Sequence, residues 1–231
     1  MAMKTVCVIQ HTEAEYLGLM EDHFEGRNIR FLYSRPFASG GSIPSDADGF
    51  DGLILLGGGP YGIVSGSLLP SLGPELRLTK AFLEKGLPVI GFGLGALILA
   101  VAAGGGADEA PLRFEIRDAI AAGPGLLGGH MPQRFPLALY LRDRPVLPDD
   151  ADVLAADAAG EALVFSIRGN CLGFLGHPGM KRGMAEDIIM EFAETPENTV
   201  ESLEALGVAQ AEIAEALTGL MVGISRHTGW M

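Results

Sequence analysis

The segment Leu87–Ala100, LPVIGFGLGALILA, decides how the rest of the chain is interpreted. It begins as an apolar strand, passes through closely spaced glycines and continues as an apolar helix-like run. Gly91, Gly93 and Gly95 form the frame G-x-nucleophile-x-G, in which a strained turn lifts one reactive side chain above the edge of a sheet. The central position here is Gly93, which has no side chain. The segment therefore predicts a strand–turn–helix elbow whose tip is empty.

Composition indicates an apolar, acidic, globular chain. Its 231 residues suffice for one sizeable α/β domain with a small appendage. The formal net charge of −13 argues against a nucleic-acid partner or an anionic membrane, because both require a basic face. Cys7 and Cys171 are too few for a disulfide framework. The first residues show no signal-peptide pattern, so we expect a cytoplasmic protein.

Strand-like and helix-like stretches alternate in the first half of the chain. We expect strands over 5–10, 29–33, 52–56 and 88–90, and helices over 14–25, 74–85 and 96–103. Near-continuous apolar strands in such an alternation predict a parallel sheet covered on both faces. Ligands of these sheets bind at the carboxyl ends of the strands. The glycine clusters 57–59 and 91–95 both follow predicted strands, so we expect them at that edge.

The second half contains short strand-like runs joined by turns, which predicts antiparallel or mixed pairing. The runs span 113–117, 137–141, 153–155, 163–168 and 171–175. A helix is expected over 184–192, and the stretch TPEN (195–198) is expected to be a boundary. We therefore divide the chain into a domain, 1–194, and a helical extension, 195–231.

The extension is expected to hold two amphipathic helices, 199–206 and 210–224. The second presents one apolar stripe, formed by Ile213, Leu217, Leu220, Met221 and Ile224. Trp230 follows almost at the end of the chain. This stripe and Trp230 predict a homodimer, a larger homo-oligomer or a partner protein bound through the residues after Thr195.

The order of landmarks resembles that of the class I glutamine amidotransferases. Four stretches carry the resemblance, which covers roughly residues 4 to 192: DGLILLGGGP (51–60), PVIGFGLGALILA (88–100), GGGADEAPLRFEI (104–116) and LGFLGHPGM (172–180). It implies a flavodoxin-like three-layer α/β/α sandwich with a mostly parallel central sheet. It also implies that Gly57, Gly58 and Gly59 form an oxyanion loop, beside Gly93 and Leu94 at the elbow.

The family's chemistry does not carry over to these residues. Hydrolysis of the glutamine side-chain amide needs a thiolate nucleophile, a histidine that moves the proton and a carboxylate that orients the histidine. Gly93 stands at the position of the cysteine and Gly179 at that of the glutamate, so only His177 remains. A glycine can offer a backbone N–H to an oxyanion, but it cannot form an acyl intermediate. We expect a protein inactive in glutamine hydrolysis that serves as a subunit, a scaffold or a regulator binding a metabolite at the elbow pocket, without cofactor or metal.

Two alternatives remain open. Gly91, Gly93 and Ala96 also match G-x-G-x-x-A, which would place a pyrophosphate at the helix N-terminus of a nucleotide-binding protein. The other alternative is an enzyme of altered chemistry in the same pocket, using His177 with groups such as Tyr61. His177 itself is expected either to be a remnant with local hydrogen bonds or to serve a new ligand.

Overall fold

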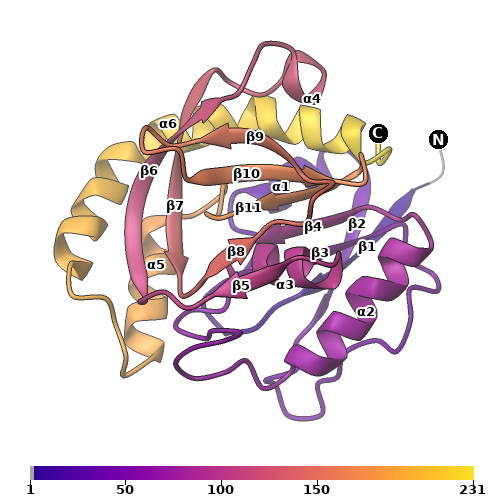
Figure 1. Ribbon diagram of the computed structural model, residues 1–231, viewed down its shortest axis with the longest axis horizontal. Helices are drawn as coiled ribbons and strands as arrows, with labels where there is room; N and C mark the ends of the chain where they lie inside the picture. The colour runs from indigo at the N-terminus through magenta and orange to yellow at the C-terminus, as the bar shows by residue number, and fades with distance from the viewer. Residues whose placement is uncertain (1–2) are drawn as a thin grey trace.

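The computed structural model describes residues 3–231, and one nine-stranded sheet runs through it (Figure 1). The strands lie in the order β2 (Ile29–Ser34), β1 (Lys4–Ile9), β3 (Gly52–Leu55), β4 (Val89–Phe92), β11 (Cys171–Phe174), β10 (Ala162–Ile167), β9 (Asp152–Ala156), β6 (Arg113–Ala121) and β7 (Arg134–Leu141). The pairs from β2 to β11 are parallel, and those from β11 to β7 are antiparallel. The sheet thus has a parallel core with a mixed extension, as the two halves of the sequence predict.

Helices cover both faces of this sheet and complete the predicted α/β/α sandwich (Figure 1). One face carries α2 (Leu72–Glu84) and α3 (Leu94–Ala102), with the small ribbon of β5 (Gly106–Asp108) and β8 (Arg144–Val146) against α3. The other carries α1 (Met20–Glu25), α5 (Arg182–Glu191) and the long α6 (Thr199–His227), while the short α4 (Leu126–Gly129) joins β6 to β7. Helix α3 is buried almost throughout because its sequence is apolar on every side.

Parallel pairing places the two glycine clusters together. Strands β3 and β4 are hydrogen-bonded neighbours that run in the same direction, so the chain leaves both at one edge. A Cβ atom built on Gly93 would lie 3.5 Å from the Cα atom of Gly57. The expected meeting of the two clusters at the carboxyl edge is confirmed.

Two helix predictions were wrong in their extent. Residues 199–206 and 210–224 belong to one continuous helix, α6, and Gly207 lies inside it. A Cβ atom built on Gly207 would lie 3.2 Å from a guanidinium nitrogen of Arg182. The helix expected over 14–25 begins only at Met20. The residues before Met20 are held in an irregular loop, where Tyr16 accepts a hydrogen bond from His177 and Leu17 donates one to Tyr33.

The apolar stripe of α6 is buried inside the chain. Its members are Ile213, Leu217, Leu220, Met221 and Ile224. Trp230 is also buried, with its ring 6.0 Å from that of Phe24 and its Nε1–H donating to the Asp51 carbonyl at 3.2 Å. These residues therefore do not supply the surface on which the oligomer prediction was based. The oligomeric state and the boundary at Thr195 stay predictions.

Helix α6 is long and apolar enough to span a membrane, judged by length and composition only, with a mean hydropathy of 1.3 over its most apolar window. A core helix of a globular protein passes the same test. The buried stripe places one face of α6 against β6 and β7, while 28% of its most apolar window is buried.

Replacement of Trp230 by alanine tests the role of the C-terminus in the core. We expect Trp230→Ala to lower the free energy of unfolding by about 3 to 5 kcal/mol, the usual cost of emptying an aromatic site in a core. The measurement is equilibrium urea unfolding, with Met231→Ala as the matched control, because that neighbouring side chain is exposed. A loss below about 1 kcal/mol for Trp230→Ala would show that the indole is not part of the core.

Candidate functional site

The turn at Gly93 has the geometry of a nucleophile elbow. Its φ of +52° and ψ of −118° lie where only glycine is comfortable, and α3 begins at the next residue. The Gly93 N–H donates to the Phe174 carbonyl at 2.9 Å, and the Gly95 N–H donates to the Leu56 carbonyl at 3.1 Å. The turn is therefore sharp, and two of its N–H groups are already hydrogen-bonded to carbonyls of this chain. This favours the elbow over an open dinucleotide loop, which would leave such donors for a pyrophosphate.

The elbow tip leaves room for a side chain that the sequence does not supply. A Cβ on Gly93 would meet the Gly57 Cα at 3.5 Å and the Tyr140 carbonyl oxygen at 3.7 Å, which are ordinary van der Waals distances. The sharp turn is thus kept although no side chain is presented. Glycine adopts this backbone conformation at little steric cost, whereas a residue with a Cβ atom would be strained there.

Glycines 57–59 form a loop packed against the elbow. The Gly57 carbonyl accepts a hydrogen bond from His11 Nδ1 at 2.8 Å, and the Gly59 N–H donates to Glu15 Oε2 at 3.2 Å. A Cβ on Gly57 would overlap the Glu15 carboxylate, which explains the glycine at this position. Among the hydrogen bonds of residues 3–231, none is donated by the N–H groups of Gly57 or Leu94. The predicted oxyanion loop and elbow residues are therefore brought together, and these two N–H groups have no acceptor within the described residues.

His177 is engaged with the backbone. Its Nε2–H donates to the Tyr16 carbonyl at 2.7 Å, and its Nδ1 accepts from the Gly179 N–H at 3.1 Å. Both contacts fit a neutral imidazole with the proton on Nε2. Burial lowers the pKa of His177 to about 4, since the charged form would lose its hydration. The contacts support the expectation of a remnant histidine with local hydrogen bonds.

Gly179, at the position that resembles the family's glutamate, is closed in by the loop before α1. A Cβ there would lie 3.1 Å from Met20 Cγ, 3.2 Å from the Leu17 carbonyl oxygen and 3.3 Å from the Leu19 nitrogen. These distances are tighter than ordinary contacts. A carboxylate side chain has no space at this position unless residues 17–20 move.

Three buried polar residues beneath the glycine loop were missed by the sequence analysis. They are His11, Glu15 and Glu75. The Nε2 atom of His11 lies 2.7 Å from Glu75 Oε2, and Ser71 Oγ donates to Glu75 Oε1. Burial alone would lower the pKa of His11, but the charge and hydrogen bond of Glu75 outweigh it and raise that pKa. Because Nδ1 must donate to the Gly57 carbonyl, the raised pKa favours an imidazolium paired with the Glu75 carboxylate.

Glu15 occupies the other side of the same loop. Removal from water raises its pKa to about 7, while the Gly59 hydrogen bond and the His11 charge act in the opposite direction. The sequence signal was the change from apolar to polar residues directly after β1, at the edge where ligands bind. The helix expected over 14–25 includes Glu15, and that prediction hid this signal.

The two residues directly after β7 form hydrogen bonds with the backbone that follows the glycine loop. Arg142 Nε donates to the Pro60 carbonyl at 3.2 Å, and Asp143 Oδ2 accepts from the Ile63 and Val64 amides at 2.9 and 3.0 Å. Tyr61 packs its ring edge-on against Phe192, with centroids 5.6 Å apart. The contacts of Tyr61 and His177 thus involve different partners, which gives no support to the altered chemistry suggested for that pair.

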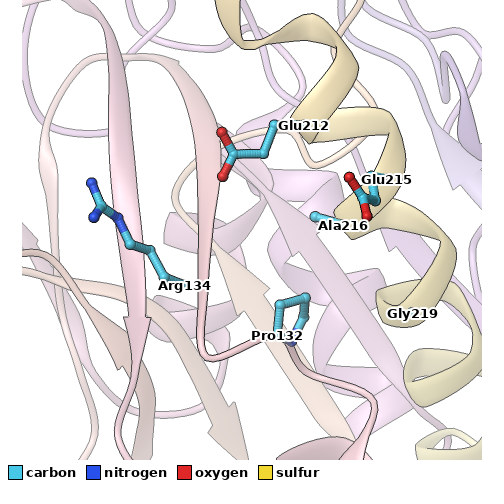
Figure 2. A pocket seen from close by; sticks show the side chains of 6 residues that line it. All are labelled: Pro132, Arg134, Glu212, Glu215, Ala216 and Gly219. Atoms are coloured by element: carbon cyan, nitrogen blue, oxygen red, sulfur yellow. The ribbon is translucent and has the colours of Figure 1, made fainter.

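A cavity away from the elbow has charged lining residues. It has a volume of about 410 Å³, lies between the start of β7 and α6, and is lined by Arg134, Glu212 and Glu215 (Figure 2). Figure 2 shows these charged groups spread along its rim. Within residues 3–231, no group of three or more His, Cys, Asp or Glu side chains is placed to hold a metal ion.

Comparisons with known proteins identify the fold. No family model matches the chain, and no curated protein matches its sequence. It is similar to a solved glutamine amidotransferase from Thermotoga maritima, with a TM-score of 0.82, 22% identity and 99% of each chain covered. A second, from Methylobacillus flagellatus, gives a TM-score of 0.82 at 22% identity over 98% of this chain and 96% of the other.

A more distant likeness is to a putative GMP synthase subunit from Thermoplasma acidophilum. Its TM-score is 0.62 at 19% identity, over 92% of this chain and all of the other. The chain therefore has the fold of the class I glutamine amidotransferases, as expected from the order of its landmarks. Likeness at this level of identity shows the fold alone.

The raised pKa of Glu15 predicts a specific pH dependence. A carboxyl whose pKa is about 7 in the folded protein and near 4.5 when unfolded stabilises the fold fully below pH 4.5 and loses that effect as the pH rises through 7. We expect Glu15→Gln to remove this loss, so that the variant gains up to about 3 kcal/mol relative to the parent between pH 4.5 and 8. The measurement is urea unfolding at several pH values. Glu13→Gln is the control, and a parallel pH profile for parent and Glu15→Gln would contradict the assignment.

The packing at residue 179 gives a second prediction. Gly179→Ala should lower the free energy of unfolding by about 1 to 3 kcal/mol, the usual cost of overpacking a filled site, and Gly179→Glu by more. Gly183→Ala is the matched control, because its Cβ would meet no atom within 4 Å. Thermal unfolding of the variants provides the measurement, and equal stability of Gly179→Ala and the control would show that the loop before α1 yields freely.

Proposed function

We propose that this chain is a glutamine amidotransferase-like protein that does not hydrolyse glutamine and that binds a small molecule at the elbow, as a subunit, scaffold or regulator. The observation that carries the proposal is an elbow that keeps its sharp turn at Gly93 without any nucleophilic side chain. Acyl transfer in this fold would need a thiolate at that point. Its absence from the sequence argues for binding without turnover.

The state of His177 supports the same conclusion. Its Nε2–H is spent on the Tyr16 carbonyl, and its low pKa means that it holds no second proton near pH 7. A histidine in a catalytic triad must accept a proton from the nucleophile and return it to the leaving group. This imidazole would first have to break a buried hydrogen bond, which makes it a poor proton carrier.

The unused amides of Gly57 and Leu94 indicate what kind of ligand fits. Buried N–H groups are nearly always hydrogen-bonded, so donors without a protein acceptor favour a ligand that brings one. A carboxylate or carboxamide oxygen accepts hydrogen bonds from backbone N–H groups at a helix start and a glycine loop. We therefore propose a small carboxylate or carboxamide metabolite as the ligand.

One observation favours a second candidate, an enzyme of altered chemistry. The pKa of about 7 for Glu15 is the value expected of a general base that works at neutral pH. Turnover of a bound ester or amide that is abolished in Glu15→Gln, while binding persists, would move this candidate to first place. Structural burial explains the raised pKa equally well, so binding without turnover is preferred.

Cytoplasmic location and association through the C-terminal helix are further parts of the proposal. The apolar stripe of α6 is buried within the chain, but Val200 and Val208 on the same helix are exposed, with exposed fractions of 67% and 88%. A homodimer or partner protein would use this outer side. Light scattering of the full-length chain tests the self-association directly.

The absence of glutaminase activity is directly testable. We expect no ammonia release from glutamine above background, and none from Gly93→Cys. In that variant the new Cβ atom meets no close contact, although the backbone there is strained for any side chain. His177 remains bonded to Tyr16, and residue 179 supplies no orienting carboxylate. Loss of the orienting group alone costs about 10⁴ in rate in related triads. A coupled ammonia assay on purified protein makes the measurement.

His177→Ala, purified in the same way, is the control for contaminating enzyme. Release that persists in this control comes from a contaminant. Release from the unmodified chain that disappears in the control would overturn the proposal, because it would reveal a nucleophile other than residue 93.

A further inference from the structure

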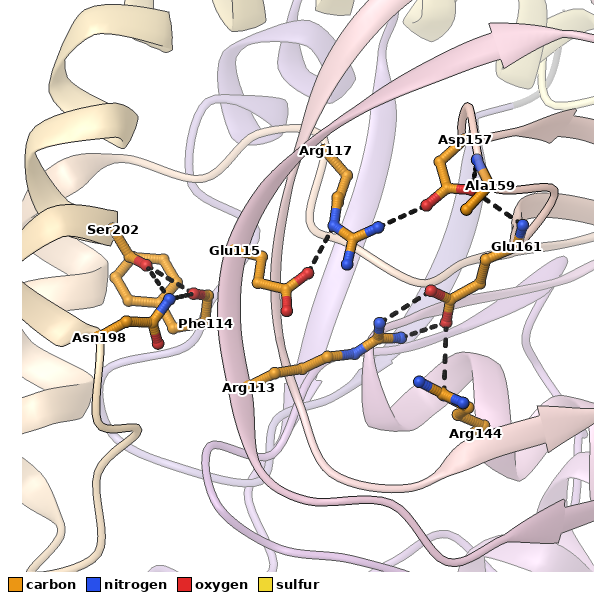
Figure 3. Close-up of polar contacts among 10 residues, drawn as sticks. All are labelled: Arg113, Phe114, Glu115, Arg117, Arg144, Asp157, Ala159, Glu161, Asn198 and Ser202. Atoms are coloured by element: carbon orange, nitrogen blue, oxygen red, sulfur yellow. Dashed lines mark hydrogen bonds and ion pairs between the residues drawn. The ribbon is translucent and has the colours of Figure 1, made fainter.

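The segment between α5 and α6, Phe192–Asn198, has no regular secondary structure and is called the strap here. It is anchored at both ends. Before it, the Glu191 carboxylate accepts hydrogen bonds from the Glu13 and Ala14 amides, each at 3.1 Å. At its far end, Asn198 Nδ2 donates to the Phe114 carbonyl at 3.1 Å, the contact drawn in Figure 3. The middle of the strap lies between these two fixed points.

Two contacts hold the middle of the strap on the glycine loop. The Phe192 ring lies against Gly59, 2.9 Å from its Cβ position, and packs edge-on against Tyr61. The Glu194 carboxylate pairs with Arg142, whose Nε also donates to the Pro60 carbonyl. One aromatic ring and one ion pair thus connect the strap to the loop that borders the elbow.

Open space borders the strap. A cavity of about 570 Å³ is lined by residues 111–113 and Glu115 on one side, by Arg142, and by strap residues 194–198 on the other. Apart from Pro196 and the half-buried Phe192, the strap side chains are exposed. The strap is therefore held by its ends and by two side chains, with little core packing beneath it.

The Arg142–Glu194 pair differs from the other ion pairs beside this cavity. Arg113 binds Glu161 through two N–H groups, and Arg117 bridges Glu115 and Asp157 (Figure 3). Glu161 and Asp157 lie in the turn that joins β9 to β10, so these arginines connect β6 to the neighbouring hairpin. Glu194 is 52% exposed and stands on an irregular segment, whereas the Arg142 side chain is only 11% exposed and keeps its hydrogen bond to the Pro60 carbonyl when Glu194 leaves. Partly exposed ion pairs contribute little and weaken further with salt, so this contact can break without disturbing the sheet.

We propose that the strap is a lid over the elbow, which opens when Glu194 leaves Arg142 and Phe192 lifts from Gly59. Opening joins the cavity to the glycine loop and gives a ligand access to Gly93. The inference rests on the proposed binding function of the elbow, but it concerns access and is tested without a ligand. Its failure would leave that function untouched.

A thiol placed at the elbow reports on the opening. Gly93→Cys is reacted with iodoacetamide at fixed pH, and modification of residue 93 is followed by peptide mass spectrometry. Cys7 and Cys171 give an internal background, because both are buried and burial raises the pKa of each thiol. The same variant is then combined with Glu194→Gln, with Phe192→Ala and, as matched control, with Glu197→Gln, another strap glutamate that makes none of the contacts described.

We expect Glu194→Gln to speed labelling of residue 93 by roughly two- to fivefold, the range of a partly exposed ion pair. Phe192→Ala should speed it by tenfold or more, and Glu197→Gln should leave it within error. Added 1 M NaCl should mimic Glu194→Gln in the parent and add little to that variant. Equal rates in all variants, or an equal rise in the control, would overturn the proposal.

Hydrogen exchange covers the case in which Gly93→Cys does not fold. In otherwise unmodified protein, Glu194→Gln should lower the protection of amides in 57–66 relative to Glu197→Gln. Identical protection in the two variants would count against the lid just as equal labelling would.

Discussion

The left-handed turn at Gly93 is the constraint on which the rest of the site depends. It joins β4 to α3 in so little space that the Gly95 N–H bonds to the residue after β3, while the Gly93 N–H bonds to the end of β11. Three neighbouring parallel strands are thereby tied at one edge. The glycine loop, His177 and the end of β7 are all positioned relative to that edge.

Buried polar groups as well as apolar side chains hold the glycine loop in place. His11 donates a hydrogen bond to the Gly57 carbonyl, and Glu15 accepts one from the Gly59 N–H. Glu75 pairs with the other ring nitrogen of His11. Burying such groups is costly, and an apolar replacement of the same shape is often at least as stable. Their presence under a loop that borders an empty elbow therefore suggests that they fix the position of the loop amides. An elbow without a nucleophile still needs those amides if it binds a ligand oxygen.

Much of this arrangement follows from the sequence, because local glycine patterns and strand periodicity carry it. The frame around Gly93 predicted the elbow, and two apolar strands ending in glycines predicted that residues 57–59 would meet it. The pairing of His11 with Glu75 could not be predicted from local patterns, because the two residues are 64 positions apart in the sequence. The filling of the space at Gly179 depends on how residues 17–20 fold back, which no local pattern reveals. Trp230 was misjudged for the same reason, because its place in the core depends on distant Phe24 and Asp51.

The central claim is that the elbow binds without forming a covalent bond, and a reactive analogue of glutamine tests it most directly. The protein is incubated with a chloroketone analogue of glutamine, and its intact mass and melting temperature are measured. We predict an unchanged mass together with a raised melting temperature, since a ligand that binds only the folded state stabilises it. A stoichiometric adduct on a residue at the elbow, such as Glu15 or His177, would contradict the claim and identify the nucleophile that the sequence does not show.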